Sequence, residues 1–201
     1  RFTVDLETGA DGQIWEHYTA DWQHDWTYNI DKPDDLFKPW GFQPGHQVEW
    51  TKLLLQLDAH RPADWHLATA TRLYDTAMDR GWDQDHGGLV YGYAPDGSFA
   101  DAHKYFWVQA EALAAAWRLY TRTGEERYRS DYHRLWGWSW DHLIDHEHGA
   151  WFRITSREGH KVEPYKSPAG KTDYHTMGAC WDVLSVMPGA AVWNATDRKR
   201  K

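Results

Sequence analysis

A repeat of about 60 residues is the feature of this sequence that most restricts its possible folds. Asp83–Tyr91 aligns residue by residue with Asp145–Arg153, and Asp11–Glu16 resembles both segments. Each of the two longer copies leads into a second turn, at Pro95–Gly97 and at Arg157–Gly159. An acidic turn, a glycine, a short aromatic strand and a second turn are typical of a β-hairpin. The sequence therefore predicts a short hairpin that recurs along the chain.

Helical segments are expected between these hairpins, because apolar residues recur there at helical spacing. The segments that carry this spacing are Val48–Leu57, Trp65–Ala77, Gln109–Tyr120, Glu125–Ile144 and Tyr174–Met187. Pro62 is expected near the first turn of the second helix. Gly124 predicts the end of the third helix, and Pro188 the end of the fifth.

The predicted unit is thus a helix, a short link, a second helix and a hairpin. One helix pair cannot bury both of its faces, so such units stack on one another. A toroid of helical hairpins, with inner helices around a central pocket, meets this need. About two and a half units are visible, whereas six would close a ring. The predicted fold is therefore all-α, an (α/α)6 barrel with short β-hairpins in its connections, of which this chain covers about half.

The composition indicates an aromatic core. The chain has 15 Trp, 11 Tyr and 6 Phe residues. Each buried Trp or Tyr removes roughly 150–250 Å² from water, which compensates for the shortage of aliphatic residues. A globular domain is therefore expected in spite of the low aliphatic content.

Charge and hydropathy exclude several classes of protein. The net charge of −8 argues against a nucleic-acid partner, since proteins that bind phosphate backbones present a basic face. No apolar run approaches the roughly 20 residues of a membrane helix. The N-terminus lacks the pattern of a signal peptide, and the single Cys180 cannot form an intrachain disulfide. A cytoplasmic protein is therefore expected.

Residues suited to chemistry gather where three predicted helices begin, at Pro44–Trp50, Lys104–Glu111 and Lys171–His175. Each start combines a titratable group with an aromatic ring. If the helices alternate between an inner and an outer layer, these starts face the central cavity. His46 and Glu49 are three residues apart and share one face of a helix. A carboxylate beside an imidazole can orient the ring for proton transfer.

Among the 13 histidines, His46 and His175 are favoured as acid/base groups because each lies at such a helix start. Trp107, at the polar-flanked start of an inner helix, can stack on a sugar ring. His86 and the pair in His146–His148 lie in hairpin turns and are expected at the surface. The segment His146–His148 lacks a third ligand at a convincing spacing, so no metal site is predicted there.

Three segments of the sequence resemble the N-acylglucosamine 2-epimerase superfamily. They are Lys38–Trp50, Lys104–Glu111 and Asp173–Cys180, and they occur in the order of the family's motifs. Within the superfamily, the resemblance is closest to the branch of D-mannose isomerases and sulfoquinovose-type aldose–ketose isomerases. In the first segment, residues 45–50 read Gly-His-Gln-Val-Glu-Trp. The residues after the histidine favour the isomerases over the epimerases.

This resemblance implies an (α/α)6 barrel and a cofactor-free exchange between an aldose and its ketose, or between epimers at carbon 2. His46 and His175 correspond to the family's acid/base pair, which would move a proton through a cis-enediol. Glu49 corresponds to the carboxylate beside the first histidine, and Trp107 to a wall of the sugar pocket. The other polar neighbours that the motifs imply are Gln109, Glu111 and Asp173. The resemblance implies no metal and no cofactor.

Members of the family are about twice as long as this chain, whose motifs match their second half. Residues 1–190 are therefore expected to form the C-terminal portion of a single barrel domain, with residues 191–201 as a tail. In the family, the first half supplies a substrate-binding Arg and further His, Asn and Tyr residues. The expected partners are a monosaccharide and either the missing N-terminal half or a second copy of the chain.

Four other functions remain open on the sequence. One is a 2-epimerase that acts on N-acylglucosamine or cellobiose. Another is a glycoside hydrolase or lyase on a similar toroid, which would use two carboxylates taken from Asp83, Asp85 and Glu111. A non-catalytic sugar-binding domain is a third, and a prenyltransferase-like toroid is the most distant.

Overall fold

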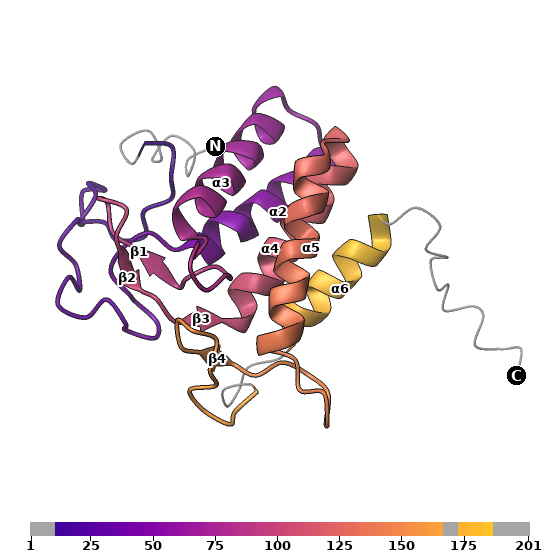
Figure 1. Ribbon diagram of the computed structural model, residues 1–201. Coiled ribbons are helices and arrows are strands. Elements are labelled where there is room, and N and C mark those ends of the chain that lie inside the picture. Colours follow the sequence, from indigo (N-terminus) through magenta and orange to yellow (C-terminus); the bar gives the residue numbers. More distant parts are fainter. Residues whose placement is uncertain (1–10, 167–172, 187–201) are drawn as a thin grey trace, which may run out of the picture.

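The computed structural model describes residues 11–166 and 173–186 (Figure 1). The helices are α2 (Pro44–His60), α3 (Asp64–Gly81), α4 (Phe106–Thr123), α5 (Glu126–His142) and α6 (Tyr174–Val186). The strands are β1 (Gly92–Tyr93), β2 (Phe99–Asp101), β3 (Lys104–Tyr105) and β4 (Ile154–Thr155). The helices gather on one side of the molecule, and the strands with their loops lie at the other (Figure 1).

The helices form two layers with α4 at the centre. Helix α4 contacts α2 on one side and α6 on the other, while α3 packs on α2 and α5 packs on α4. Thirteen of the 18 residues of α4 are buried, as its central position requires. The alternation of inner helices (α2, α4, α6) with outer helices (α3, α5) was expected, and the described residues confirm it.

The ends of the helices follow from local chemistry. Helix α2 begins at Pro44, whose fixed φ suits a first helical turn. Helix α4 ends at Thr123, and Gly124 caps it as predicted: it has φ of 74° and donates its N–H to the carbonyl of Tyr120. Pro62 lies near the first turn of α3, as predicted, directly before the N-cap Ala63.

Helix α5 is shorter than the predicted Glu125–Ile144. It ends at His142, since the N–H groups of Leu143 and Ile144 both turn back to the carbonyl of Ser139. Ile144 then pairs with Trp151 in a β-bridge. The predicted end of the fifth helix at Pro188 and the 191–201 tail lie outside the described residues.

The repeat is visible in the backbone. Trp82 pairs with Leu89 in one turn, and Ile144 pairs with Trp151 at the matching positions of the next. In the first turn, Oδ1 of Asp83 accepts the N–H groups two and three residues ahead; Oδ1 of Asp145 does the same in the second. The glycines that close the second turns, at 97 and 159, both have φ of 87°. The predicted recurrence of the turns is therefore confirmed.

The second copy forms the predicted hairpin, in which Thr155 pairs with Lys161, and this hairpin also pairs with an earlier strand. In the second copy, β4 pairs with β3, which directly precedes α4, in the register Lys104↔Thr155 and Tyr105↔Ile154. The N–H of Phe106 continues this contact to the carbonyl of Arg153. Strand β4 thus connects two successive repeat units, because its backbone hydrogen bonds are made with β3 of the neighbouring unit. The same contact fixes the start of α4.

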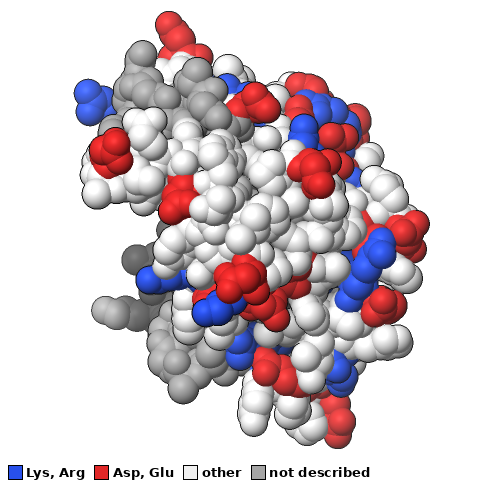
Figure 2. All heavy atoms as spheres, turned by 90° about the vertical axis from the view of Figure 1, so that its left-hand side faces the viewer, with Lys and Arg blue, Asp and Glu red and all other residues white. Residues whose placement is uncertain are grey.

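The core is aromatic, as the composition indicated. Trp15, Tyr74, Tyr93 and Tyr128 are among the largest fully buried side chains. None of the described helices is long and apolar enough to cross a bilayer. On the face seen in Figure 2, Lys and Arg side chains are interspersed with Asp and Glu side chains.

Candidate active site

The starts of the three inner helices meet around one tryptophan. Trp107, near the first turn of α4, is 6% exposed. Its ring centroid lies 5.1 Å from the ring of His46 on α2 and 5.2 Å from the ring of His175 on α6. The two predicted acid/base histidines therefore contact the same indole.

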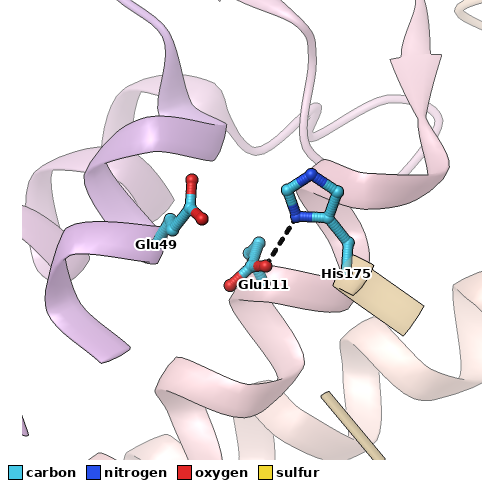
Figure 3. A group of neighbouring side chains, drawn as sticks. All are labelled: Glu49, Glu111 and His175. Carbon is cyan, nitrogen blue, oxygen red and sulfur yellow. Dashed lines mark hydrogen bonds and ion pairs between the residues drawn. The ribbon is translucent and has the colours of Figure 1, made fainter. Parts of the chain in front are cut away.

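Glu111 holds the ring of His175. Nδ1 of His175 lies 2.7 Å from Oε1 of Glu111, whose side chain is fully buried, whereas the His175 side chain is 14% exposed. An ionised carboxylate can only accept a hydrogen bond, so Nδ1 carries the proton. The other ring nitrogen, Nε2, lies on the far side of the ring from Glu111 (Figure 3).

His46 has the same kind of partner, but from an unexpected part of the chain. Its Nδ1 hydrogen-bonds Oε1 of Glu16, which precedes it by 30 residues. The sequence pointed to Glu49 for this role. Glu49 instead lies with Glu111 and His175, and the three offer ligand atoms within 4.8 Å of one another.

The charges around His46 favour its protonated form. Burial by itself would lower the pKa of His46, but the hydrogen bond and the charge of Glu16 outweigh it. The charges of Glu49 and Glu111 act in the same direction, and the net effect raises the pKa above its ordinary value. His46 is therefore a stronger base than a free imidazole.

Glu111 has a different place from the one expected. It was predicted to contact the sugar, but its side chain is fully buried. Its second oxygen, Oε2, lies 2.5 Å from Nζ of Lys52 on α2. Glu111 thus lies behind His175 and joins the helices α2, α4 and α6.

Gln109 also serves the fold. Its amide oxygen accepts the N–H of Leu89 at 3.0 Å, and its amide nitrogen donates to the carbonyl of Leu89 at 2.7 Å. Both groups are used by this backbone, and the side chain is buried. A sugar contact for Gln109 therefore finds no support in the geometry.

Asp173 lies exposed in the turn before α6, where its backbone carbonyl accepts the N–H of Met177. Its predicted sugar contact stays a prediction.

The cluster of Glu49, Glu111 and His175 has the composition of a small metal site (Figure 3). It is not the segment considered from the sequence: His146 and His148 are exposed in a surface turn, as expected for them. Asp83, nominated above for glycoside cleavage, is fully buried in ion pairs with Lys104 and Arg157, which removes it as a candidate.

Two residues of this site were missed from the sequence, Glu16 and Lys52. Glu16 lies in a loop with no helical frame, so no spacing could connect it to His46. Lys52 did carry a signal: it is a single charge beside the apolar run Leu53–Leu55, three residues after Glu49. Such a charge in an inner helix needs a buried partner.

Comparison with known protein families identifies the family of this chain. Residues 1–179 match the family described as N-acylglucosamine 2-epimerase (GlcNAc 2-epimerase). The chain belongs to this family. The resemblance stated from the three sequence segments is thereby confirmed.

Individual members of the N-acylglucosamine 2-epimerase family are similar over most of the chain. A D-mannose isomerase from Marinomonas mediterranea is 57% identical over 175 residues, which are 87% of this chain and 44% of that protein. A crystal structure of a D-mannose isomerase superposes with a TM-score of 0.87 at 55% identity, over 92% of this chain and 47% of that one.

A cellobiose 2-epimerase from Bacillus thermoamylovorans superposes with a TM-score of 0.73 at 15% identity, covering 92% of this chain and 47% of its own, and this likeness shows the fold alone. These neighbours are (α/α)6 barrel enzymes, so the described helices have the arrangement of part of such a barrel. The chain spans about half the length of the relatives it matches.

Proposed function

We propose that this chain carries the acid/base groups of an aldose–ketose isomerase that interconverts D-mannose and D-fructose or a closely related pair. The observation that carries the proposal is the pair of histidines on Trp107, each with Nδ1 bonded to a glutamate. Two imidazoles that are each held through Nδ1 can supply an acid and a base to one sugar. The relatives with the name D-mannose isomerase support this choice of substrate.

The proposed reaction starts from the open-chain aldose, in which the carbonyl makes the proton on carbon 2 acidic. One histidine removes this proton as a general base, which gives a cis-enediol. The other histidine protonates and deprotonates the oxygens. Return of a proton to carbon 1 gives the ketose, and return to carbon 2 from the opposite face gives the epimer. In this proposal Trp107 forms a wall of the pocket on which the sugar can stack.

Proton NMR of D-mannose in deuterated water with a chelator tests this proposal. We expect fructose that carries solvent deuterium. His46→Ala and His175→Ala should each reduce turnover about 10²–10⁴-fold, as for loss of a general acid or base. His103→Ala is the matched control, since His103 also bonds a carboxylate, Asp101 at 2.7 Å, but lies outside this site.

The outcomes separate the alternatives. Glucose in place of fructose would assign a 2-epimerase. Cleavage of a chromogenic glycoside without isomerisation would assign a glycoside-processing enzyme. The chain is assayed alone and again with the N-terminal half of the M. mediterranea relative added. Sugar binding without turnover in both assays would assign a binding domain and contradict the proposal.

We also propose that this chain completes its barrel with another chain segment, either an N-terminal half or a second copy. Apolar side chains that are exposed on α2 and α6, the two inner helices on either side of α4, support this proposal. They are Trp50, Leu53 and Leu57 on α2 and Met177, Trp181 and Leu184 on α6. The complete barrel, the limits 1–190 of the domain, the absence of a cofactor and the location in the cytoplasm remain predictions.

A further inference from the structure

Lys52 lies inside an acidic cluster rather than at the surface. Its side chain is 4% exposed, and Nζ lies 2.5 Å from Oε2 of Glu111 and 4.0 Å from Oδ2 of Asp182 on α6. Nζ also lies 5.4 Å from the centre of the Tyr174 ring. Lys52 thus connects α2 with both other inner helices.

Lys52 is the partner on which Glu111 depends. Oε1 of Glu111 is used by His175, and apart from the Lys52 ion pair Oε2 has no hydrogen-bond partner among the described residues. Asp182 does not depend on Lys52 in this way. Its Oδ1 accepts from Arg118 at 2.5 and 3.1 Å and from Gln56 at 2.8 Å.

The cluster holds more acidic than basic groups. Its acidic side chains are Glu49, Glu111 and Asp182, and its basic side chains are Lys52 and Arg118. A buried carboxylate without a counter-charge is costly, so Glu111 requires a cation at Oε2. Glu49, Glu111 and His175 are also close enough together to bind a metal ion, and the Lys52 ammonium lies against one of these ligands.

We propose that Lys52 is the resident cation of this cluster. It positions Glu111, which in turn fixes the His175 ring, and its charge keeps divalent metal ions off Glu49, Glu111 and His175. The positioning of His175 for catalysis rests on the proposed function above, whereas the exclusion of metal does not.

Calorimetric titration with Zn²⁺ tests the exclusion of metal on this chain. Lys52→Met should gain one equivalent of bound Zn²⁺ relative to the unchanged protein, and Lys52→Met combined with Glu111→Gln should lose it again. Arg118→Met is the matched control: it removes a cation from the far side of Asp182 and should not add the site. Equal Zn²⁺ stoichiometry for Lys52→Met and the unchanged protein would overturn the proposal.

Folding is checked by circular dichroism. If Lys52→Met does not fold, Lys52→Gln replaces it, because its amide can still donate to Oε2 of Glu111 while the charge is lost. The extra equivalent of Zn²⁺ is expected in Lys52→Gln as well, and its absence there counts against the proposal.

NMR of labelled histidine tests the positioning of His175 independently of turnover. The Nδ1–H proton that His175 shares with Glu111 is assigned by its loss in His175→Gln. We expect this resonance to be protected from exchange in the unchanged protein and in Arg118→Met, and lost in Lys52→Met. Its persistence in Lys52→Met would overturn the positioning role even if the chain turned over no sugar.

If the chain isomerises mannose, the kinetics add a third measurement. Lys52→Met should lower kcat about 10- to 100-fold, the effect typical of losing a group that orients a site residue. KM should change less than about threefold, and Lys52→Arg should recover most of kcat, because a guanidinium also pairs with a carboxylate. Unchanged kcat in Lys52→Met would contradict the proposal.

Discussion

At the scale of single residues, the site depends on a close contact at Gly45. A Cβ added at Gly45 would overlap the ring of Trp107 and lie 2.8 Å from Cγ2 of Val108. A glycine at this position therefore allows the ring of Trp107 to lie close to both histidines.

Gly45→Ala should destabilise the protein by about 1–2 kcal/mol, since overpacking outweighs the helix preference of alanine. Denaturant unfolding measures this change. Gly137→Ala in α5 is the control, because nothing lies within 4 Å of its added Cβ, and it should stabilise by about 0.5–1 kcal/mol. Stabilisation by Gly45→Ala would show that Trp107 has room to move.

Glu16→Gln should lower the pKa of His46, since the variant loses the carboxylate that raises it. An NMR titration of the His46 ring measures this directly. Glu49→Gln should lower the pKa less, because Glu49 contributes its charge without a hydrogen bond to the ring. A pKa of His46 unchanged in Glu16→Gln would contradict this account.

The ion pair between Glu16 and His46 makes the stability of the protein depend on pH. The folded-state pKa of His46 lies above the unfolded value of 6.5, so the contribution of the pair is full below pH 6.5 and is lost as pH rises through the folded pKa. Because both side chains are partly exposed, Glu16→Gln should cost only about 0.5–1 kcal/mol at acidic pH and less at alkaline pH.

At the scale of elements, the two repeated turns differ in what surrounds the same aspartate. Asp83 and its partner Lys104 are fully buried, whereas Asp145 pairs with Lys166 nearer the surface. Burial alone would raise the pKa of Asp83, but hydrogen bonds from Arg157 and Lys104 outweigh this and hold it well below its ordinary value.

Asp83→Asn keeps the acceptor for the turn but removes the charge, so Lys104 is left buried without its counter-ion. We expect a loss of about 3 kcal/mol at neutral pH, the lower end for a broken buried pair, since Arg157 is partly exposed. The ionised carboxylate of Asp83 contributes its full stability above the unfolded-state pKa of 3.8. This contribution is lost as the pH falls from 3.8 through the lower folded-state pKa. Thermal unfolding measures the loss, and Asp145→Asn is the matched control with a smaller expected effect. Equal effects would show that burial of Lys104 is unimportant.

The elements themselves were largely predictable. Apolar spacing and the stop at Gly124 located α4, and the turn residues located both repeats, because these signals act within a few residues. The pairing of β3 with β4 was not predictable, since it joins segments about 50 residues apart whose contact depends on how two repeat units stack.

At the scale of the whole molecule, the exposed apolar faces of α2 and α6 should drive association. We expect this chain to self-associate in a concentration-dependent way, because several large apolar side chains exposed on one helix are typical of interfaces. Trp181→Glu should reduce the association, since Trp181 is 67% exposed on α6. Phe37→Ser is the control, since Phe37 is 85% exposed in the loop before α2. Analytical ultracentrifugation measures the mass, and a monomer at all concentrations would contradict this prediction.

The sequence by itself predicted the repeat, the positions of the inner helices and the family, and it singled out the two histidines and Trp107 that the structure brings together. Each of these depends on short motifs or on local periodicity. Only the tertiary structure decided which carboxylate serves which histidine: Glu16 reaches His46 from 30 residues away, and Glu111 reaches His175 from 64 residues away. Spacing favoured Glu49 for His46, because residues three apart share a helix face. Contacts between side chains of different elements depend instead on how helices and loops pack, which local periodicity does not encode.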